Sequence, residues 1–492
     1  MDHRGSWSHR IAVLLGASVV LVTTLVQPGP AAADCAAWCQ GSSIPRRDSV
    51  YPAHSMPGVD AWHYGLSLRW APAQHRLHGD ETLTFRAARG TRVVRLALGG
   101  RMRVSSAQLD GRPVRVSHAK QVLVVHHAVR AGSMHALRIR YAGTLPQAPP
   151  LALQRNAVGM YRTRTGDVFT NDEPVGAFHW YAVNDQPSDK AFYDFRLSVP
   201  APQVGVANGR LVARHRVRGQ EITRFHLDAP ASSYLTTVEF GRYRQTRRPA
   251  VHGVPVTLWT PRGDRRALHR ARYLPAALRW VERRLGAYPF GSLSVIVVKG
   301  YDSGMENQTL VTVGDTAYDT AKDTLVHEVA HQWYGDLVTP RDWRDVWMNE
   351  GMATLLQYDW LGQRHHTTLT DVLGQEVPRA QAGWDAFGPP GDYDRYVFAA
   401  DNVYFPPALM WDQLRRHVGG QAFWSMVRDW PGLATHAGGN ATRSAYLSWI
   451  RSRLDVPPHF FHDWLLGRHM PAVPGVDGRR TVPRAVVQRN WL

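Results

Sequence analysis

The stretch DTLVHEVAHQWYGDLVTPRDWRDVWMNEG, over residues 323–351, contains two histidines that are four residues apart, His327 and His331. On a helix, side chains at this spacing project from one face about one turn apart, so both imidazoles can reach a single ion. Glu328 lies beside the first histidine, and Glu350 follows in a second predicted helix. The pattern predicts a metal site in which His327, His331 and Glu350 are the ligands.

Two histidines and a carboxylate favour zinc, which in catalytic sites keeps a fourth position for water and lowers the pKa of that water toward about 7. Glu328 adjoins a ligand without being one. It is therefore the candidate general base that moves a proton from the water to the leaving amine. We expect one zinc ion per chain and metal-assisted hydrolysis of an amide. The alternative is a helix that merely carries histidines on a solvated or core face, and Glu350 argues against it.

The N-terminal segment has the layout of a secretory signal peptide. Basic residues precede an apolar run over 11–26, and the small residues before Ala33 suit cleavage near that position. The run is short for a membrane span of about twenty residues, so we expect export without a stable membrane span, the alternative being an uncleaved anchor. Cys35 and Cys39 follow the expected cut and suit a small local disulfide in an oxidising compartment. The expected location is extracellular or in the cell envelope.

The chain is strongly basic, with a formal net charge of +18, and the excess is almost wholly arginine because only four of the 58 basic residues are lysines. The arginines are scattered, and no array of basic and aromatic residues indicates a groove for nucleic acid. We therefore expect no nucleic-acid partner. A solvated cationic surface that favours an anionic cell envelope is the preferred interpretation.

Between about residues 61 and 241, apolar side chains alternate with other side chains, as in 64–70, 137–141 and 193–199. This period of two predicts β-strands, and Asp110-Gly111 and Asn208-Gly209 are hairpin-type turn signals. The pattern is typical of an antiparallel β sandwich or saddle.

Beyond about residue 251 the pattern changes to helices with a few buried strands. Apolar residues at spacings of three and four predict an amphipathic helix over 268–285, which Pro275 would kink. The stretch 362–402 is predicted as irregular helix and loop. Short strands are predicted over 293–298 and 310–313, and further helices over 409–417, 422–430, 443–454 with Thr442 as its cap, and 460–466.

The segment Ser303-Gly304-Met305-Glu306-Asn307 resembles the GAMEN motif of the aminopeptidase N-type zinc peptidases, a gluzincin family, and it precedes the zinc helix as in that family. Further matches are Thr170–Glu173 (the family's TQxE segment), Asp185–Pro187 with Lys190 (its DEP…K stretch), Gly335–Asp336 and Asn349–Gly351. The resemblance extends over most of the mature chain. It implies an α+β multidomain fold, in which an antiparallel β domain precedes a thermolysin-like catalytic domain. The expected order is a signal peptide over 1–33, a linker over 34–58, the β domain over 59–248 and the catalytic domain, ending in a helical subdomain, over 249–492.

The resemblance also implies roles for the matched residues. Glu306 and Glu173 would bind the free α-ammonium of a peptide, and two carboxylates in a partly dry pocket favour a cation on physical grounds. The backbone at Gly304 and Met305 would form a sheet edge for an extended peptide. Asn171 stands where the family has glutamine, and its shorter side chain would contact the first substrate residue.

The family's transition-state tyrosine lies some tens of residues after the glutamate ligand, in a Tyr-x-Lys-Gly context. Tyr404 occupies that place here and would donate a hydrogen bond to the developing oxyanion. Pro406-Pro407 replaces the Lys-Gly pair, and Tyr393 and Tyr396 are rival candidates.

Together these residues predict a secreted zinc aminopeptidase that removes single residues from peptides with free N-termini. The resemblance is to a short form without the C-terminal helical domain of many relatives, which would leave a more open cleft. Two alternatives stay open: a related gluzincin hydrolase of a non-peptide substrate, and a catalytically silent scaffold of the cell envelope. The oligomeric state and the preferred first residue do not follow from the sequence.

Overall fold

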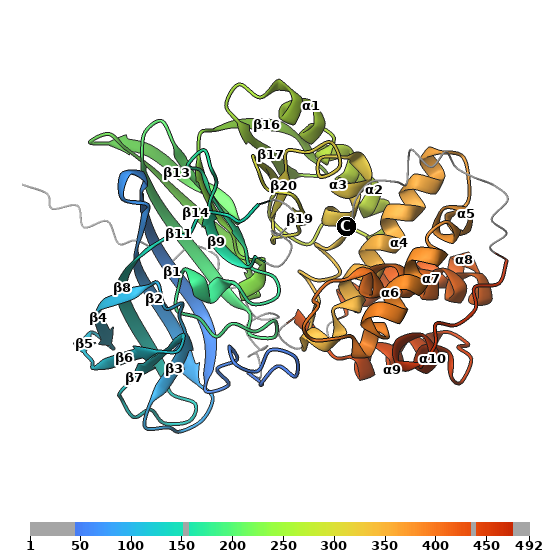
Figure 1. Cartoon of the computed structure of the whole chain (residues 1–492), viewed down its shortest axis with the longest axis horizontal. Coiled ribbons are helices and arrows are strands. Elements are labelled where there is room, and N and C mark those ends of the chain that lie inside the picture. Colours follow the sequence, from blue (N-terminus) through green and yellow to red (C-terminus); the bar gives the residue numbers. More distant parts are fainter. Residues whose placement is uncertain (1–44, 151–156, 434–438, 476–492) are drawn as a thin grey trace, which may run out of the picture.

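The computed structural model describes residues 45–150, 157–433 and 439–475. The predicted signal peptide, Cys35 and Cys39 lie outside these residues. Within the described ranges, no helix is both long and apolar enough to cross a membrane. The chain forms an N-terminal half built of sheets and a C-terminal half rich in helices (Figure 1).

The N-terminal half is organised around an eight-stranded sheet in the order β13-β14-β11-β1-β2-β8-β4-β5. Its strands are β1 (Val59–Ala71), β2 (Arg76–Ala87), β4 (Arg103–Leu109), β5 (Arg112–Pro113), β8 (Met134–Thr144), β11 (Ala191–Pro200), β13 (Arg210–Val217) and β14 (Gln220–Ala231). Along β1, Leu66 and Leu68 are buried, whereas Ser67 and Arg69 lie on the opposite face, which is the predicted period of two. Paired strands run antiparallel as predicted, except β1 and β11, which are parallel.

Two smaller sheets pack against the buried face of the large one. One contains β12 (Val204–Ala207), β15 (Val238–Gly241), β10 (Val168–Asn171) and β9 (Gly159–Arg162), and the other contains β3 (Val94–Ala97), β7 (Val122–Val125) and β6 (Val116–Ala119). Buried side chains from all three sheets, such as Leu66, Leu96 and Phe169, form one hydrophobic core. The opposite face of the large sheet is turned away from the helical half (Figure 1).

The two predicted hairpin turns have different outcomes. Asp110 and Gly111 have φ angles of 52° and 76° and join β4 to β5 as a hairpin. The prediction for Asn208-Gly209 is wrong, because the strands on either side, β12 and β13, belong to different sheets. The buried amide of Asn208 donates to the backbone oxygens of Leu235 (2.9 Å) and Gln308 (2.7 Å), so this turn is fixed to distant segments instead of closing a hairpin.

The C-terminal half begins with a five-stranded sheet in the order β16-β17-β18-β20-β19. Its strands are β16 (Tyr243–Val251), β17 (Val254–Pro261), β18 (Leu293–Val298), β20 (Leu310–Gly314) and β19 (Gly304–Met305). β16 begins within the range predicted for the β domain, and the domain boundary at residue 248 stays a prediction. β19 is the edge strand, so one side of its backbone is free of strand pairing.

The helix predicted over 268–285 is instead two helices, α1 (Arg265–Ala271) and α2 (Leu274–Leu285). Pro275 is in the first turn of α2, where its missing N–H is not needed. Within a continuous helix, its ring would clash with the carbonyl four residues earlier, at Ala271. The chain therefore breaks at this point, whereas the sequence predicted only a kink.

The remaining helices cover the C-terminal half. They are α3 (Lys322–Ala330), α4 (Trp347–Arg364), α5 (Leu369–Gly374), α6 (Val377–Phe387), α7 (Asp401–Val418), α8 (Gly420–Asp429), α9 (Arg443–Arg453) and α10 (Phe460–Leu466), and the short strands β21 (Thr339–Pro340) and β22 (Asn440–Ala441) pair in parallel. The stretch 362–402 is more helical than predicted, because it contains α5 and α6. α7 starts well before the predicted residue 409 and includes both prolines. Thr442 caps α9 as predicted, since its hydroxyl accepts a hydrogen bond from the backbone N–H of Ala445.

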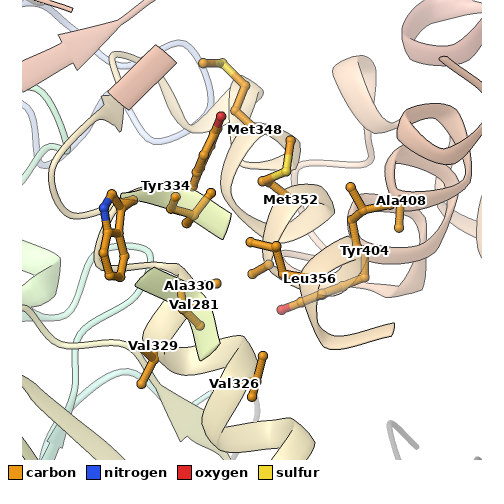
Figure 2. Close-up of a cluster of buried hydrophobic side chains, with 14 of the residues drawn as sticks. Val281, Val326, Val329, Ala330, Tyr334, Met348, Met352, Leu356, Tyr404 and Ala408 are labelled. Carbon is orange, nitrogen blue, oxygen red and sulfur yellow. The ribbon is translucent and has the colours of Figure 1, made fainter. Parts of the chain in front are cut away.

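Apolar packing fixes the helix that carries the two histidines. Val326, Val329 and Ala330 of α3 are fully buried, and Met352 and Leu356 of α4 are buried in the same cluster (Figure 2). Each fully buried aliphatic side chain of this size contributes roughly 1.5–3 kcal/mol to stability. The packing sets the rotation of α3 about its axis, and therefore the direction in which its histidines point.

Candidate metal centre and active site

The three predicted metal ligands meet between α3 and α4. His327 is in the last turn of α3, His331 ends that helix with φ of −58°, and Glu350 is in the first turn of α4. The Nε2 atoms of the two histidines are 3.1 Å apart, and Glu350 Oε2 is 3.3 Å from His327 Nε2 and 3.4 Å from His331 Nε2. All three side chains are buried, so the group is a compact set of ligand atoms inside the protein.

These distances fit zinc. In a tetrahedral site with bonds of about 2.0–2.1 Å, neighbouring ligand atoms lie about 3.3 Å apart. His331 Nδ1 is 3.1 Å from the backbone oxygen of Tyr334, which can only accept, so Nδ1 holds the proton and Nε2 keeps its lone pair toward Glu350. Buried atoms with lone pairs that face one another repel, and a cation between them removes that repulsion.

The charge of Glu350 is favoured by its neighbours. Burial raises the pKa of this carboxyl, but His331 and His327 more than offset the effect and hold the pKa at about 2. Glu350 is therefore ionised at neutral pH, as a metal ligand must be.

Glu328 lies on α3 next to the metal group and is also buried. Burial, and secondly the charge of Glu306, raise the pKa of the Glu328 carboxyl well above its usual value. A carboxylate with a raised pKa accepts a proton more readily, which suits a general base. A Cβ atom on Gly304 would collide with Glu328 Oε1, so the glycine lets this carboxylate lie against the backbone of β19.

A second group of carboxylates adjoins the metal group and shares Glu350 with it. One oxygen each of Glu173, Glu306 and Glu350 lies within 4.8 Å of the others. Burial, and secondly the charge of Glu306, raise the pKa of Glu173 well above its usual value, and burial raises the pKa of Glu306. Carboxylates this close repel unless a proton or a cation is shared between them. The arrangement is suited to bind a positively charged group next to the metal.

Two residues that the sequence interpretation missed hold Glu306 in place. Gln332 follows a metal ligand directly, and its Nε2 donates to the backbone oxygen of Glu306 at 2.9 Å. Its Oε1 accepts from the Thr309 N–H and the Tyr288 hydroxyl, both at 3.0 Å. This fully buried glutamine directly follows a predicted ligand, and that position in the sequence is the signal that could have identified it as a positioning residue.

The second missed residue is Glu239 of β15, which is fully buried. Its Oε1 accepts hydrogen bonds from Thr312 at 3.0 Å and from Thr237 at 2.6 Å. Thr312 accepts in turn from Asn307 Nδ2 at 3.0 Å, and Thr237 is 2.6 Å from Thr170. The network joins the segment before Glu173 to the segment after Glu306. No local motif surrounds Glu239, so only the three-dimensional structure reveals this link.

The predicted sheet edge and Asn171 have distinct surroundings. Gly304 and Met305 form β19 and pair with β20 antiparallel, which leaves the outer side of β19 for an extended chain. Asn171 ends β10, and its side-chain amide donates to the backbone oxygen of Ala157 at 3.2 Å. Its contact with the first substrate residue stays a prediction.

Tyr404 is the tyrosine that lies by the metal group. Its ring centroid is 6.3 Å from that of His327, and the side chain extends from α7 toward α3 (Figure 2). The two rivals lie elsewhere, since the Tyr393 hydroxyl donates to the Trp343 backbone oxygen at 2.8 Å and Tyr396 is 81% exposed.

The prolines after Tyr404 have a packing role. A Cβ atom on Gly351 would collide with the ring of Pro407, so α4 and α7 approach closely at this point. Gly351 follows the ligand Glu350, and this contact therefore sets the position of α7, and with it Tyr404, relative to the metal group. Although Pro406 and Pro407 replace the family's Lys-Gly pair, Tyr404 lies inside a continuous helix.

Lys190 connects the two halves of the molecule. Its buried ammonium donates to the backbone oxygens of Asp336 (2.6 Å) and Leu337 (3.2 Å), in the turn that follows α3. Burial lowers the pKa of Lys190 to about 7, and the neighbouring Asp336 opposes that shift. The β domain thus contacts the turn that supports the metal helix.

Comparisons with known proteins match both halves in the same order. Residues 61–235 match the Peptidase M1 N-terminal domain, and residues 272–387 match the Peptidase family M1 domain. The chain is 28% identical to human glutamyl aminopeptidase over 240 residues, which are 44% of this chain and 25% of that protein. It is 26% identical to aminopeptidase N from Acetobacter pasteurianus over 365 residues, which are 68% of this chain and 99% of that protein. The chain thus spans only about a quarter of the mammalian relative and nearly all of the bacterial one.

A solved structure has the same architecture. A mutant of the M1 zinc metallopeptidase from Deinococcus radiodurans, bound to a Tyr-Ser-Ala substrate, superposes with a TM-score of 0.77 at 26% sequence identity, over 87% of this chain and 99% of that one. The likeness includes both the β domain and the helical half that carries the candidate metal group. From its domain order, its fold and its ligand set, the chain belongs to peptidase family M1.

Proposed function

We propose that this protein is an exported zinc aminopeptidase that releases single residues from peptides with a free N-terminus. The observation that carries the proposal is the shared position of Glu350, which belongs both to the metal group and to the carboxylate group with Glu173 and Glu306. An ammonium held by those carboxylates would lie beside the metal. The scissile bond of a peptide anchored in this way is the one that follows its first residue.

Each side chain has a definite task in the reaction. His327, His331 and Glu350 would hold the zinc ion, which when bound supplies a Lewis acid and makes a water molecule more acidic. The Glu328 carboxylate accepts a proton from the attacking water and returns it to the nitrogen of the leaving amine. Its raised pKa helps it to hold that proton between the two transfers.

The substrate is positioned by the chain's own backbone and carboxylates. Glu306 and Glu173 accept hydrogen bonds from the α-ammonium, which places the first residue and stops the peptide from extending past it. The outer edge of β19, at Gly304 and Met305, hydrogen-bonds the extended peptide backbone. The Tyr404 hydroxyl donates to the oxyanion that develops on the attacked carbonyl.

Export is proposed from the N-terminal sequence, whose basic, apolar and small-residue regions are those of a signal peptide ending at residue 33. Mass spectrometry of the mature protein from the culture medium or the envelope tests it. A mature N-terminus near residue 34 is expected, and an intact N-terminus on cytoplasmic protein would contradict export.

A panel of aminoacyl chromogenic substrates tests the activity. The purified protein should release the chromophore, lose this ability with a chelator and regain it with added zinc. A protein that binds zinc at the three ligands but hydrolyses no aminoacyl substrate would instead be a scaffold, and the proposal would be wrong.

A further inference from the structure

The outward face of the eight-stranded sheet carries a groove that is separate from the metal centre. Residues from seven neighbouring strands, β13 to β4, line it, and its volume is about 770 Å³. At about 4.8 Å between strands, it extends roughly 29 Å across the sheet. We call it the arginine groove, defined by Arg69, Arg76, Arg103, Arg140, Arg196 and Arg218, which are all exposed.

The strand register explains why these arginines share one face. Residues that pair across neighbouring strands point to the same side of a sheet. Ser67 pairs with Arg196, and Arg196 pairs with Arg224. Two residues further along β1, Arg69 pairs with Ser198 on one side and with His78 on the other. Two neighbouring rows of the sheet therefore carry mainly basic and hydroxyl side chains, with Asp80 between Ser67 and Arg140 in the first row.

Most of this charge is not neutralised by the protein. Asp80 forms an ion pair with Arg140 at 3.1 Å. For the other five arginines of the groove, the described part of the chain shows no carboxylate within 4.0 Å. Burial, and secondly the charges of Arg69 and Arg76, lower the pKa of His78. An anion bound here would relieve repulsion among the arginines.

The shape of the groove and the chemistry of its arginines indicate which kind of anion it would bind. Guanidinium groups bind phosphate through paired hydrogen bonds. A long groove that crosses seven strands fits a linear chain, whereas a flat membrane surface would not reach its floor, where Ser198 and Ile222 are 6% and 8% exposed. Proteins that bind single-stranded nucleic acids typically stack the bases on exposed aromatic rings, whereas Tyr141, the tyrosine that lines the groove, is 2% exposed.

We propose that the arginine groove binds a linear phosphodiester polymer without bases, such as a poly(glycerol phosphate) chain of a cell envelope. Such a ligand has the charge that the arginines require. Binding would hold the enzyme at an anionic envelope, with the metal centre on the other side of the β domain. The proposal does not depend on peptidase activity.

The test uses the full mature protein and fluorescently labelled poly(glycerol phosphate). Binding should weaken with salt, with a slope of log Kd against log salt of about 3.5 if the five unpaired arginines each neutralise one phosphate. The double variant Arg69→Gln with Arg196→Gln should lower the affinity at least about tenfold and reduce the slope to about 2. The matched control is Arg89→Gln with Arg130→Gln, which removes the same charge from exposed positions of the same domain outside the groove.

Three results would overturn the proposal. The first is equal loss of binding in the control variant, which would mean that only total charge matters. The second is unchanged binding in the groove variant, with folding of both variants checked by thermal unfolding. The third is tighter binding of a charge-matched single-stranded oligonucleotide, or of phosphatidylglycerol vesicles, than of the labelled polymer.

Discussion

The side-chain amide of Gln332 donates a hydrogen bond of 2.9 Å to the backbone oxygen of Glu306. Gln332 follows His331, one of the proposed metal ligands, and Glu306 is one of the carboxylates proposed to bind the substrate's ammonium. One hydrogen bond thus connects the turn that follows α3 to the segment around Glu306. The spacing between metal and ammonium, on which exopeptidase cleavage depends, rests partly on this contact.

We predict that Gln332→Leu raises KM for aminoacyl substrates and destabilises the fold by about 2–6 kcal/mol. The substitution leaves the Glu306 carbonyl and the Thr309 N–H buried without partners, and each such group costs about 1–3 kcal/mol. Urea unfolding and steady-state kinetics measure the two effects. Gln413→Leu, which removes an exposed bond to the Ala472 backbone, is the control and should change stability by less than about 0.5 kcal/mol. Equal effects of the two variants would contradict the positioning role.

Glu328→Gln should lower kcat by about a hundredfold to ten-thousandfold and leave zinc bound, because the amide cannot accept a proton while all three ligands remain. Metal analysis of the purified variant tests whether zinc stays bound, and steady-state kinetics tests the loss of kcat. Glu376→Gln changes another buried carboxyl, outside the site, and should retain activity. Wild-type turnover in the Glu328 variant would rule out this base.

Tyr404→Phe should reduce kcat by about a hundredfold to a thousandfold with little change in KM, because its hydroxyl acts on the transition state and not on the bound substrate. Tyr396→Phe at an 81% exposed position is the matched control. A large rise in KM with unchanged kcat would assign Tyr404 to substrate binding instead.

Glu81 gives a prediction for stability against pH. It is fully buried in the β domain, and burial raises its pKa from 4.5 to about 8, although a hydrogen bond from the Ala182 N–H opposes the shift. The native carboxyl therefore keeps its proton where the unfolded one has lost it. Its contribution to stability is complete below about pH 4.5 and is lost as the pH rises through about 8.

Between pH 5 and pH 8, Glu81→Gln should therefore lose about 4 kcal/mol less stability than the wild-type protein. Urea unfolding at both pH values measures the difference. Glu221 shows the opposite pKa shift. Burial raises its pKa, but Arg214 and Arg216 outweigh that effect and lower it. A Glu81 variant with the same pH slope as the wild type would show that this carboxyl ionises freely in the native state.

The motifs proposed for the metal and the substrate could be picked out from the sequence, because the residues of each motif lie close together in the chain or at a spacing that a helix brings to one face. His327 and His331 share one turn of a helix, and the alternation in β1 shows directly in the residues. Contacts between distant segments could not be predicted in this way. Glu239 connects the segments of Glu173 and Glu306 through hydrogen bonds with Thr237, just before its own strand, and with Thr312 of β20, and no motif near it in the chain signals that role.

Local rules also failed where tertiary packing overrode them. Pro406 and Pro407 predict that a helix starts after them, yet α7 continues through both, and Pro407 packs against Gly351 of α4. Asn208-Gly209 has the composition of a hairpin turn, but the buried amide of Asn208 binds two other segments. In both cases, contacts with distant residues outweigh the preference of the local sequence.

The most direct test of the account is the hydrolysis of two peptides that differ only in acetylation of the N-terminus, by the zinc-loaded protein and by the chelated protein. Under the proposed function, Glu306 and Glu173 bind a charged amine beside the metal group. We predict that the zinc-loaded protein releases the first residue of the free peptide and leaves the acetylated peptide intact, and that the chelated protein cleaves neither. Equal cleavage of both peptides would contradict the account.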